Sequence, residues 1–127
     1  MARWLGEAVV DSGDSLLAIT SRGDGSTIGV LAYRLGYPRQ GWLSVEVVAV
    51  EPRLSGQGYD AEAVRLLEEG ALERGWARRF CAPVRHDDGL GLYFWLRLGY
   101  RPTVAGESTW PGAAPRDMMA MVRIAAT

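Results

Sequence analysis

Cysteine, histidine and long apolar runs are scarce in this chain, and each shortage excludes a class of protein. The 127 residues include one cysteine, Cys81, and one histidine, His86. A single cysteine cannot form an internal disulfide, and a single histidine without a cysteine cluster does not make a zinc site. No apolar run approaches the roughly 20 residues that a helix needs to cross a bilayer. We therefore predict no disulfide, no bound metal and no membrane span.

An excess of charge of one sign is missing as well. Lysine and arginine number 14 against 15 aspartates and glutamates, which gives a net charge of -1. So small a net charge creates no basic field for a nucleic-acid backbone or an anionic membrane. The stretch 1–14 also lacks the apolar core of a secretory signal peptide. These absences predict a cytoplasmic protein that binds neither nucleic acids nor membranes.

The composition that remains is that of a globular domain, with 48% apolar and 23% charged residues. Turn residues and β-branched residues predict strands in its first part. Leu16–Ser21 and Thr27–Leu35 flank a glycine-containing turn and are expected to form a hairpin. Trp42–Val50 is dense in β-branched residues and is predicted to be a central strand that ends before Pro52.

Helical spacing begins after this strand. In the predicted helix Tyr59–Arg74, Ala63 and Leu67 belong to the apolar side, while Glu68 and Glu69 are assigned to the opposite, polar side. The remaining predicted elements are a strand at Arg78–Pro83, a helix at Gly89–Leu98, and strands at Tyr100–Thr103 and Met118–Ile124. Strand–helix–strand units favour parallel pairing, whereas the hairpins favour antiparallel pairing. We therefore expect an α/β fold with a mixed sheet.

Two glycines lie where the first predicted helix begins, in Ser55-Gly56-Gln57-Gly58-Tyr59-Asp60. Glycine lets backbone N–H groups converge, and a helix N-terminus adds positive partial charge, so such a turn can bind a diphosphate. A tight strand-to-helix connection without a ligand would have the same two glycines. No Gly-Lys-Ser/Thr follows, which excludes a P-loop, and the third glycine of a Rossmann fingerprint is missing.

This turn and a second segment resemble the GNAT N-acetyltransferases. That family has a strand ending in Val-x-Pro, then Arg/Gln-Gly-x-Gly-x-Gly/Ala at a helix start, and Val50-Glu51-Pro52 precedes the turn here. Residues 88–100 resemble its second element, Asn-x-x-Ala-x-x-Phe-Tyr-x-x-x-Gly-Phe. The resemblance covers residues 16–124 and implies a single GNAT-like domain over residues 1–127. Its expected fold is a mixed, mostly antiparallel central sheet with a parallel splayed strand pair and flanking helices.

The resemblance also implies a site for acetyl-CoA and a reaction, acetyl transfer to a primary amine. The backbone of Val48, Ala49 and Val50 would grip the pantetheine and the thioester. The diphosphate would lie on the turn, and the second element would complete the cofactor site. In addition to residues 48–50, the resemblance implies that the cofactor is bound by Ser55, Gly56, Gln57, Gly58, Tyr59, Asp60, Asp88 and Trp95.

The turn departs from the family pattern at both ends. Ser55 stands where the family has arginine or glutamine, and Asp60 stands where it has glycine or alanine. A carboxylate beside a diphosphate is repulsive, although in the first turn of a helix it also stabilises the helix N-terminus. Both changes are expected to weaken binding of the cofactor, and Gln57 and Arg53 are the nearest residues that could compensate.

The catalytic positions are also altered. Trp95 stands where many relatives have the tyrosine that protonates the departing thiolate, and an indole cannot supply that proton. A thiol with a pKa of ~8.5 can leave as the thiolate without an obligatory acid. Glu46 is the candidate general base, with a solvated strand carboxylate as the simpler alternative. Tyr93 is a second catalytic candidate, with an aromatic ring packed on the sheet as the simpler alternative.

The family carries a strand and two helices before its central hairpin, so the resemblance implies an N-terminally trimmed fold with an open acceptor site. A macromolecular amine, a second copy in a homodimer, or another protein could complete that site. The alternative to an enzyme is a degenerate, non-catalytic GNAT-like module that binds an acyl-CoA or a protein. A sheet domain that serves assembly alone is the third interpretation. An enzyme would release CoA in the presence of an amine. A binding module would bind the cofactor without releasing CoA, and an assembly domain would do neither.

Overall fold

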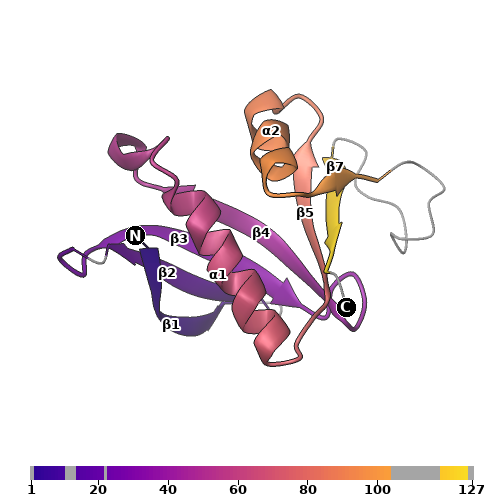
Figure 1. Ribbon diagram of the computed structural model, residues 1–127, viewed down its shortest axis with the longest axis horizontal. Helices are drawn as coiled ribbons and strands as arrows, with labels where there is room; N and C mark the ends of the chain where they lie inside the picture. The colour runs from indigo at the N-terminus through magenta and orange to yellow at the C-terminus, as the bar shows by residue number, and fades with distance from the viewer. Residues whose placement is uncertain (1, 11–13, 22, 104–117, 126–127) are drawn as a thin grey trace.

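The computed structural model describes residues 2–10, 14–21, 23–103 and 118–125, which contain one seven-stranded sheet and two α-helices (Figure 1). The elements in chain order are β1 Ala2–Val10, β2 Asp14–Ser21, β3 Thr27–Leu35, β4 Trp42–Val50, the 3-10 turn η1 Pro52–Leu54, α1 Tyr59–Glu73, β5 Arg79–Arg85, α2 Gly89–Arg97, β6 Arg101–Pro102 and β7 Met118–Ile124. In these ranges, no helix is both long and apolar enough to cross a membrane.

The sheet has the order β1-β2-β3-β4-β5-β7-β6. The β4 and β5 pair is parallel, and the other neighbouring pairs are antiparallel. The predicted mixed, mostly antiparallel sheet with one parallel pair is therefore confirmed. The strand β1 was not predicted, and it pairs with β2 over most of its length. Only residues 11–13 separate the two strands, which is too short a segment for the two helices that the family carries before its hairpin.

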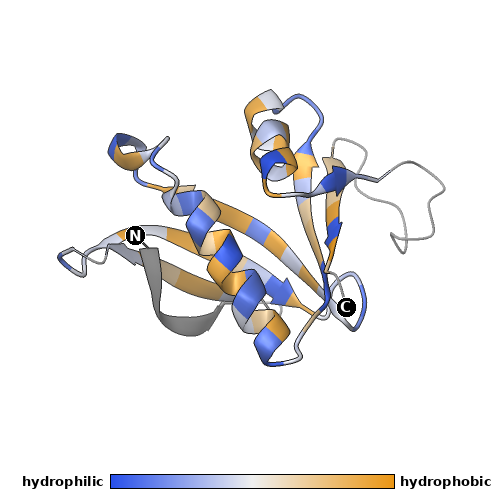
Figure 2. Cartoon of the chain, in the orientation of Figure 1, coloured by the Kyte–Doolittle hydropathy of each residue, from blue (hydrophilic) through white to orange (hydrophobic). Residues whose placement is uncertain are grey.

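Both helices pack against one hydrophobic cluster on the sheet. Ala63, Val64, Leu67 and Ala71 recur at helical spacing on α1 and are buried, so they form the stripe that faces the strands. Trp95 and Leu98 bring α2 and the residue that follows it into the same cluster. Figure 1 shows α1 crossing the β2–β4 part of the sheet and α2 lying beside β5. Figure 2 shows hydrophobic and hydrophilic residues in turn along α1, as expected for a helix with one buried side.

Glu68 is buried, so its assignment to the polar side of the helix is wrong. Its side chain is 5% exposed, and it lies one turn after Val64 and just before Ala71 in the buried stripe. The Tyr100 hydroxyl donates a hydrogen bond of 2.5 Å to Glu68 Oε2, and Arg123 Nη1 lies 3.6 Å from Oε1. Burial raises the pKa of the Glu68 carboxyl, and the Tyr100 and Arg123 contacts counteract part of that rise. The cluster ties the middle of α1 to β7.

A β-bulge interrupts β4 at Glu46. Ala32 pairs with Val47 and Tyr33 pairs with Val45, so Glu46 is the extra residue on β4. Val45 belongs to the core cluster and Val48 packs against it, which shows that the alternation of side chains changes phase at the bulge. The side chains of β4 therefore do not alternate strictly between the two faces of the sheet on passing Glu46.

Candidate functional site

Strands β4 and β5 begin as neighbours and then separate. Their register pairs Trp42, Leu43 and Ser44 with residues 79–81, and no later residue of β4 pairs with β5. A cavity of about 440 Å³ lies on the diverging part, between the strands and the start of α2. Glu46, Val48 and Pro83 are among its lining residues. This confirms the predicted splay of the parallel pair.

The glycine turn follows the diverging end of β4. Gly56 and Gly58 have φ angles of 80° and 85°, a left-handed conformation that residues with a Cβ rarely adopt. Gly58 is the N-cap of α1, and no side chain caps the helix from that position. Within the described ranges, no hydrogen-bond acceptor is present for the N–H groups of the run from Gly56 to Asp60. These N–H groups form a backbone cradle that suits an anion.

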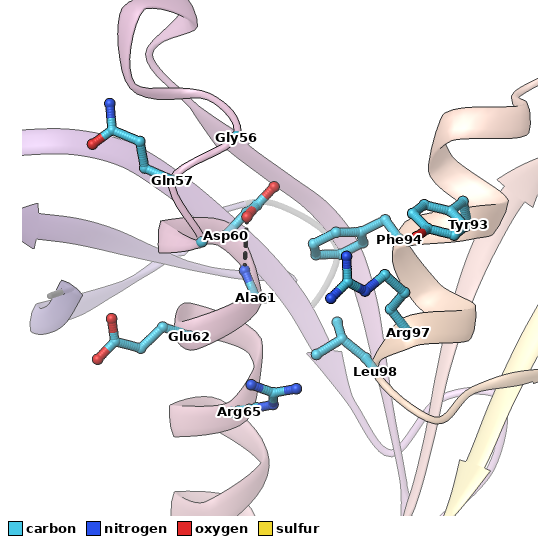
Figure 3. Close-up of a pocket in the computed structure, with 11 residues that line it drawn as sticks. Gly56, Gln57, Asp60, Ala61, Glu62, Arg65, Tyr93, Phe94, Arg97 and Leu98 are labelled. Atoms are coloured by element: carbon cyan, nitrogen blue, oxygen red, sulfur yellow. Dashed lines mark hydrogen bonds between the residues drawn. The ribbon is translucent and has the colours of Figure 1, made fainter.

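A second, larger cavity opens beside the cradle, with a volume of about 800 Å³ (Figure 3). Gly56, Gln57 and Gly58 form one wall, and residues of α1 and α2 form the others. Asp60 and Phe94 line this cavity and also the smaller one. The two cavities are therefore neighbours on either side of this pair of residues, and together they extend along what we call the path, from the turn to the gap between β4 and β5.

Asp60 occupies part of the helix start itself. Its Oδ1 accepts a hydrogen bond of 2.9 Å from the N–H of Ala61, drawn as the dashed line in Figure 3. A first-turn carboxylate also interacts favourably with the positive end of the helix dipole. The hydrogen bond from Ala61 is thus a specific contact through which Asp60 stabilises the helix N-terminus, as predicted. The same carboxylate places a negative charge among the lining residues of the larger cavity.

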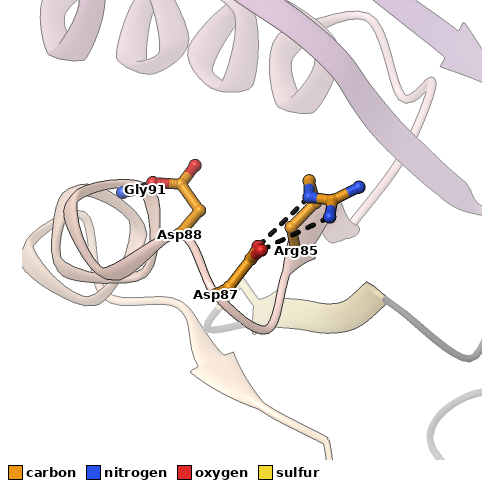
Figure 4. A network of polar contacts seen from close by, with 4 residues as sticks. All are labelled: Arg85, Asp87, Asp88 and Gly91. Carbon is orange, nitrogen blue, oxygen red and sulfur yellow. Dashed lines mark hydrogen bonds and ion pairs between the residues drawn. The ribbon is translucent and has the colours of Figure 1, made fainter.

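The start of α2 is capped in a different way. Asp88 is the N-cap residue, and its Oδ1 accepts a hydrogen bond of 2.8 Å from the N–H of Gly91 (Figure 4). A Cβ at position 91 would collide with the Asp88 carboxylate as it lies here, so any other residue there would require the carboxylate to shift. Arg85 and Asp87 form an ion pair of 3.1 Å in the loop just before the cap. Asp88 also lines the smaller cavity.

The three other candidates of the site have different surroundings. Trp95 is 6% exposed, packs edge to face against Phe94 and Tyr100, and lines the smaller cavity. Tyr93 is 58% exposed and lines the larger cavity, so its alternative placement as a ring packed on the sheet is wrong. Glu46 is half-buried and lines the smaller cavity.

Most of the residues predicted from the sequence lie along this path, but not all of them. Ala49, Val50, Ser55 and Tyr59 line neither of the two cavities. Arg53, the proposed compensating cation, is instead paired with Glu51 at 2.7 Å. The sequence reasoning missed Arg65 and Arg97, which line the larger cavity. Arg65 lies four residues after Ala61 and Arg97 four after Tyr93, so helical spacing from the turn and from Tyr93 could have found them.

The single cysteine and the single histidine of the chain take no part in this site. Cys81 is fully buried, and burial raises the pKa of its thiol to about 12. The thiol is therefore unreactive at neutral pH. His86 is exposed in the loop between β5 and α2. Among the residues with described positions, no group of three or more histidine, cysteine, aspartate or glutamate side chains could hold a metal ion.

No protein-family model and no curated protein sequence matches the chain. Solved structures do match it. An acetyltransferase from Thermus thermophilus aligns with a TM-score of 0.71 at 20% identity, over 91% of this chain and 66% of that one. A GNAT family acetyltransferase from Elizabethkingia anophelis with acetyl-CoA bound aligns with a TM-score of 0.69 at 12% identity, over 89% and 77%. The chain therefore has the GNAT fold.

A third structure with the GNAT fold is the PaiA N-acetyltransferase from Thermoplasma acidophilum in complex with coenzyme A. It aligns with a TM-score of 0.69 at 11% identity, over 88% of this chain and 61% of that one. This chain thus spans between 61% and 77% of the length of these three structures. The fold expected from the two sequence motifs is confirmed.

Proposed function

We propose that this chain binds acetyl-CoA and transfers its acetyl group to a primary amine. One observation carries the proposal: in a GNAT fold, the gap between β4 and β5 opens beside a turn whose backbone N–H groups have no acceptor in the described chain. Acetyl-CoA is an elongated ligand with an anionic diphosphate between its nucleotide and its thioester arm. A backbone cradle for an anion, with a gap between two strands close by, fits that elongated shape and that position of the charge.

The chain offers a backbone contact at each stage of this path. The N–H groups from Gly56 to Asp60 would hold the diphosphate at the positive end of α1. Further in, β4 pairs with β3 on one edge, whereas residues 48–50 have no partner in β5 on the other edge. Backbone groups alternate between the two edges of a strand, so those of the Val48-Ala49-Val50 segment that face the open edge can hydrogen-bond the amides of a pantetheine arm much as a neighbouring strand would.

The smaller cavity suits a positively charged acceptor. Three of its lining residues are acids, namely Glu46, Asp60 and Asp88, and no lysine or arginine is among them. Its other lining residues are largely apolar and include Val47, Leu90 and Phe94. Carboxylates attract an ammonium group, and apolar walls accept the carbon chain that bears it.

Glu46 is the residue to which we assign the general-base role. It lines the smaller cavity, on the diverging part of β4, where the thioester would lie. Glu46 would accept a proton from the amine, directly or through a water, so that the nitrogen can attack the carbonyl carbon. The C–N bond then forms, the C–S bond breaks, and the thiolate leaves with the electron pair. Tyr93 lines the larger cavity, at the opposite end of the path, so we assign it to contact with the nucleotide.

Release of the CoA thiol from acetyl-CoA in the presence of amines tests this function. The thiol is followed with a thiol reagent, and the buried Cys81 contributes little background in the folded protein. We expect release with at least one class of primary amine, and Glu46→Gln should lower its rate by about 100-fold without weakening acetyl-CoA binding. Glu69→Gln is the control, because it removes an exposed carboxylate of α1 that lines neither cavity. Equal rates in the two variants would contradict the role of Glu46.

A second candidate function is binding of an acyl-CoA without turnover. Trp95 favours it, because a buried indole stands where a proton donor would be expected and cannot supply a proton at neutral pH. Calorimetric titration with acetyl-CoA separates the candidates. Saturable binding without amine-dependent thiol release indicates the second function, and release indicates the first.

A further inference from the structure

The larger cavity contains two cationic side chains that neither sequence motif accounts for. Arg65 extends from α1, and Arg97 extends from the last turn of α2. Figure 3 shows both guanidinium groups in the space between the two helices, on the side of the turn where Asp60 and Phe94 lie. Across the described residues, neither arginine forms an ion pair with a carboxylate. Both charges are therefore available to a ligand.

The charge balance of the cavity depends on these two residues. Its acidic lining residues are Asp60 and Glu62, and its basic lining residues are Arg65 and Arg97. Without the arginines, two negative charges would stand beside the backbone cradle and repel a phosphate. With the two arginines, the cavity has as many basic as acidic lining residues, and the cradle keeps its attraction for anions.

Both side chains can reach toward the turn. Arg65 follows Asp60 by five residues, or about 7.5 Å along the helix axis. Side chains on a helix lean toward its N-terminus, so Arg65 leans back toward the cradle. The Arg97 guanidinium carbon lies 5.7 Å from the centre of the Tyr93 ring, and Tyr93 lines the same cavity. This contact holds the guanidinium on the side of α2 that faces the cavity.

We propose that Arg65 and Arg97 form a phosphate clamp that recognises the nucleotide end of acetyl-CoA, an inference that rests on the proposed acetyl-CoA site. A guanidinium presents a planar set of N–H donors that matches phosphate oxygens, and it stays charged at any physiological pH. The cradle holds one phosphate by its backbone, and the clamp holds a neighbouring phosphate of the same ligand. The clamp thus supplies the positive charge that Ser55 and Asp60 remove from the turn.

Calorimetric titration of Arg65→Gln, Arg97→Gln and the double variant tests the clamp. We expect each single variant to bind acetyl-CoA roughly tenfold more weakly, as the loss of one charge-assisted contact predicts, and the double variant to bind more weakly still. Arg39→Gln is the matched control. Arg39 lies in the turn before β4, and the cradle follows the far end of this strand, which is about 30 Å long. The affinity of the Arg39→Gln variant for acetyl-CoA should be within about twofold of that of the unaltered protein.

Two further measurements identify the contact. Acetylated dephospho-CoA lacks the 3′-phosphate, so a loss of affinity that persists with it places the clamp on the diphosphate, and a loss that disappears places the clamp on the 3′-phosphate. Both results support the clamp. The loss should also shrink between about 0.05 M and about 0.5 M salt, because salt screens the attraction. Melting temperatures of the variants confirm that each is folded.

The failures of the two proposals are distinguishable. If the unaltered protein does not bind acetyl-CoA, the proposed function is wrong and the clamp is wrong with it. If it binds, and Arg65→Gln and Arg97→Gln behave like Arg39→Gln, the clamp alone is wrong. A loss of affinity that is the same at both salt concentrations also contradicts the clamp, because it would indicate altered packing and not a lost charge.

Discussion

The two helices of this chain begin in opposite ways. The start of α2 is closed by its own side chain, since Asp88 accepts the N–H of Gly91. The start of α1 has a left-handed glycine, Gly58, as its N-cap and no side-chain cap from that position. Both starts lie beside the same path of cavities. The α1 start leaves five consecutive backbone donors, from Gly56 to Asp60, without an acceptor among the described residues, whereas the α2 start leaves the two of Gly89 and Leu90.

Under the proposed function, this difference separates a helix start that is structural from one that would hold a ligand. A helix that caps itself gains stability and loses its capacity to bind an anion, whereas an open start keeps that capacity at a cost in stability. Asp60 places α1 between the two extremes, because its carboxylate accepts the N–H of Ala61 and leaves the preceding donors open. Exchanging features between the two starts should therefore separate stability from affinity.

The largest effect is expected from the glycines of the open start. Gly56→Ala combined with Gly58→Ala puts two side chains on left-handed backbone. Each should lower the free energy of unfolding by roughly 1–2 kcal/mol. The turn should relax and disperse the N–H groups, so acetyl-CoA should bind at least about tenfold more weakly. Gly89→Ala is the control at the closed start, where a Cβ meets no atom within 4 Å. Urea unfolding and calorimetry check both effects, and unchanged binding in the double variant would show that the turn is only a connection.

A smaller effect of opposite sign is expected at Asp60. Asp60→Ala removes a negative charge from the path and frees the N–H of Ala61, so acetyl-CoA should bind roughly three- to tenfold more tightly. The helix should lose about 0.3–1 kcal/mol of stability. Asp60→Asn separates the two causes, because it keeps an acceptor for the N–H and removes the charge. Weaker binding in both variants would mean that the carboxylate itself contacts the ligand or a bound cation.

The closed start should respond in stability rather than in affinity. Asp88→Ala removes the cap and should cost about 1 kcal/mol, which lowers the melting temperature by a few degrees. Binding of acetyl-CoA should change by less than about twofold, because Asp88 already serves the helix. Thermal melts with and without acetyl-CoA give both quantities. A large loss of affinity with unchanged stability would reverse the roles of the two starts.

The smallest effect concerns pH and the interior of α1, which holds a buried carboxylate. Burial raises the pKa of Glu68 above its unfolded value of ~4.3, so the folded chain holds that proton more tightly than the unfolded chain does. Stability should be greatest below the unfolded pKa and should fall as the pH rises toward the folded pKa. Glu68→Gln should lessen this fall, and the exposed Glu69→Gln should not. Parallel curves of unfolding free energy against pH for all three proteins would contradict the burial of the charge.

The sequence predicted every strand and α-helix from β2 to β7 in the correct order, because turn residues and periodicity mark these elements locally. It did not predict β1, whose pairing with β2 is a contact between segments and has no local marker as strong as Pro52 or Gly58. Glu68 was misplaced for a related reason, since a buried carboxylate is acceptable only when Tyr100 and Arg123 arrive from elsewhere in the chain. The bulge at Glu46 likewise depends on the register with β3.

For the site, the sequence identified the turn but not its surroundings. The two glycines are local signals, and the structure places them at the mouth of the larger cavity. Arg65 and Arg97 come from two helices, and their convergence is fixed only by how α1 and α2 pack on the sheet. Arg53 was favoured because it is near the turn in sequence, yet it pairs with Glu51. Proximity along the chain is thus a poor guide to which cation faces a ligand.

The most direct test of the account is an amide NMR titration with acetyl-CoA that compares the glycines of the two helix starts. We predict that the N–H signals of Gly56 and Gly58 shift as acetyl-CoA saturates the protein, since a phosphate becomes their acceptor. The signal of Gly91 should move much less, because its N–H already donates to Asp88. Unmoved Gly56 and Gly58 signals at millimolar acetyl-CoA, or equal shifts at both starts, would contradict the claim that the open start of α1 is the diphosphate site.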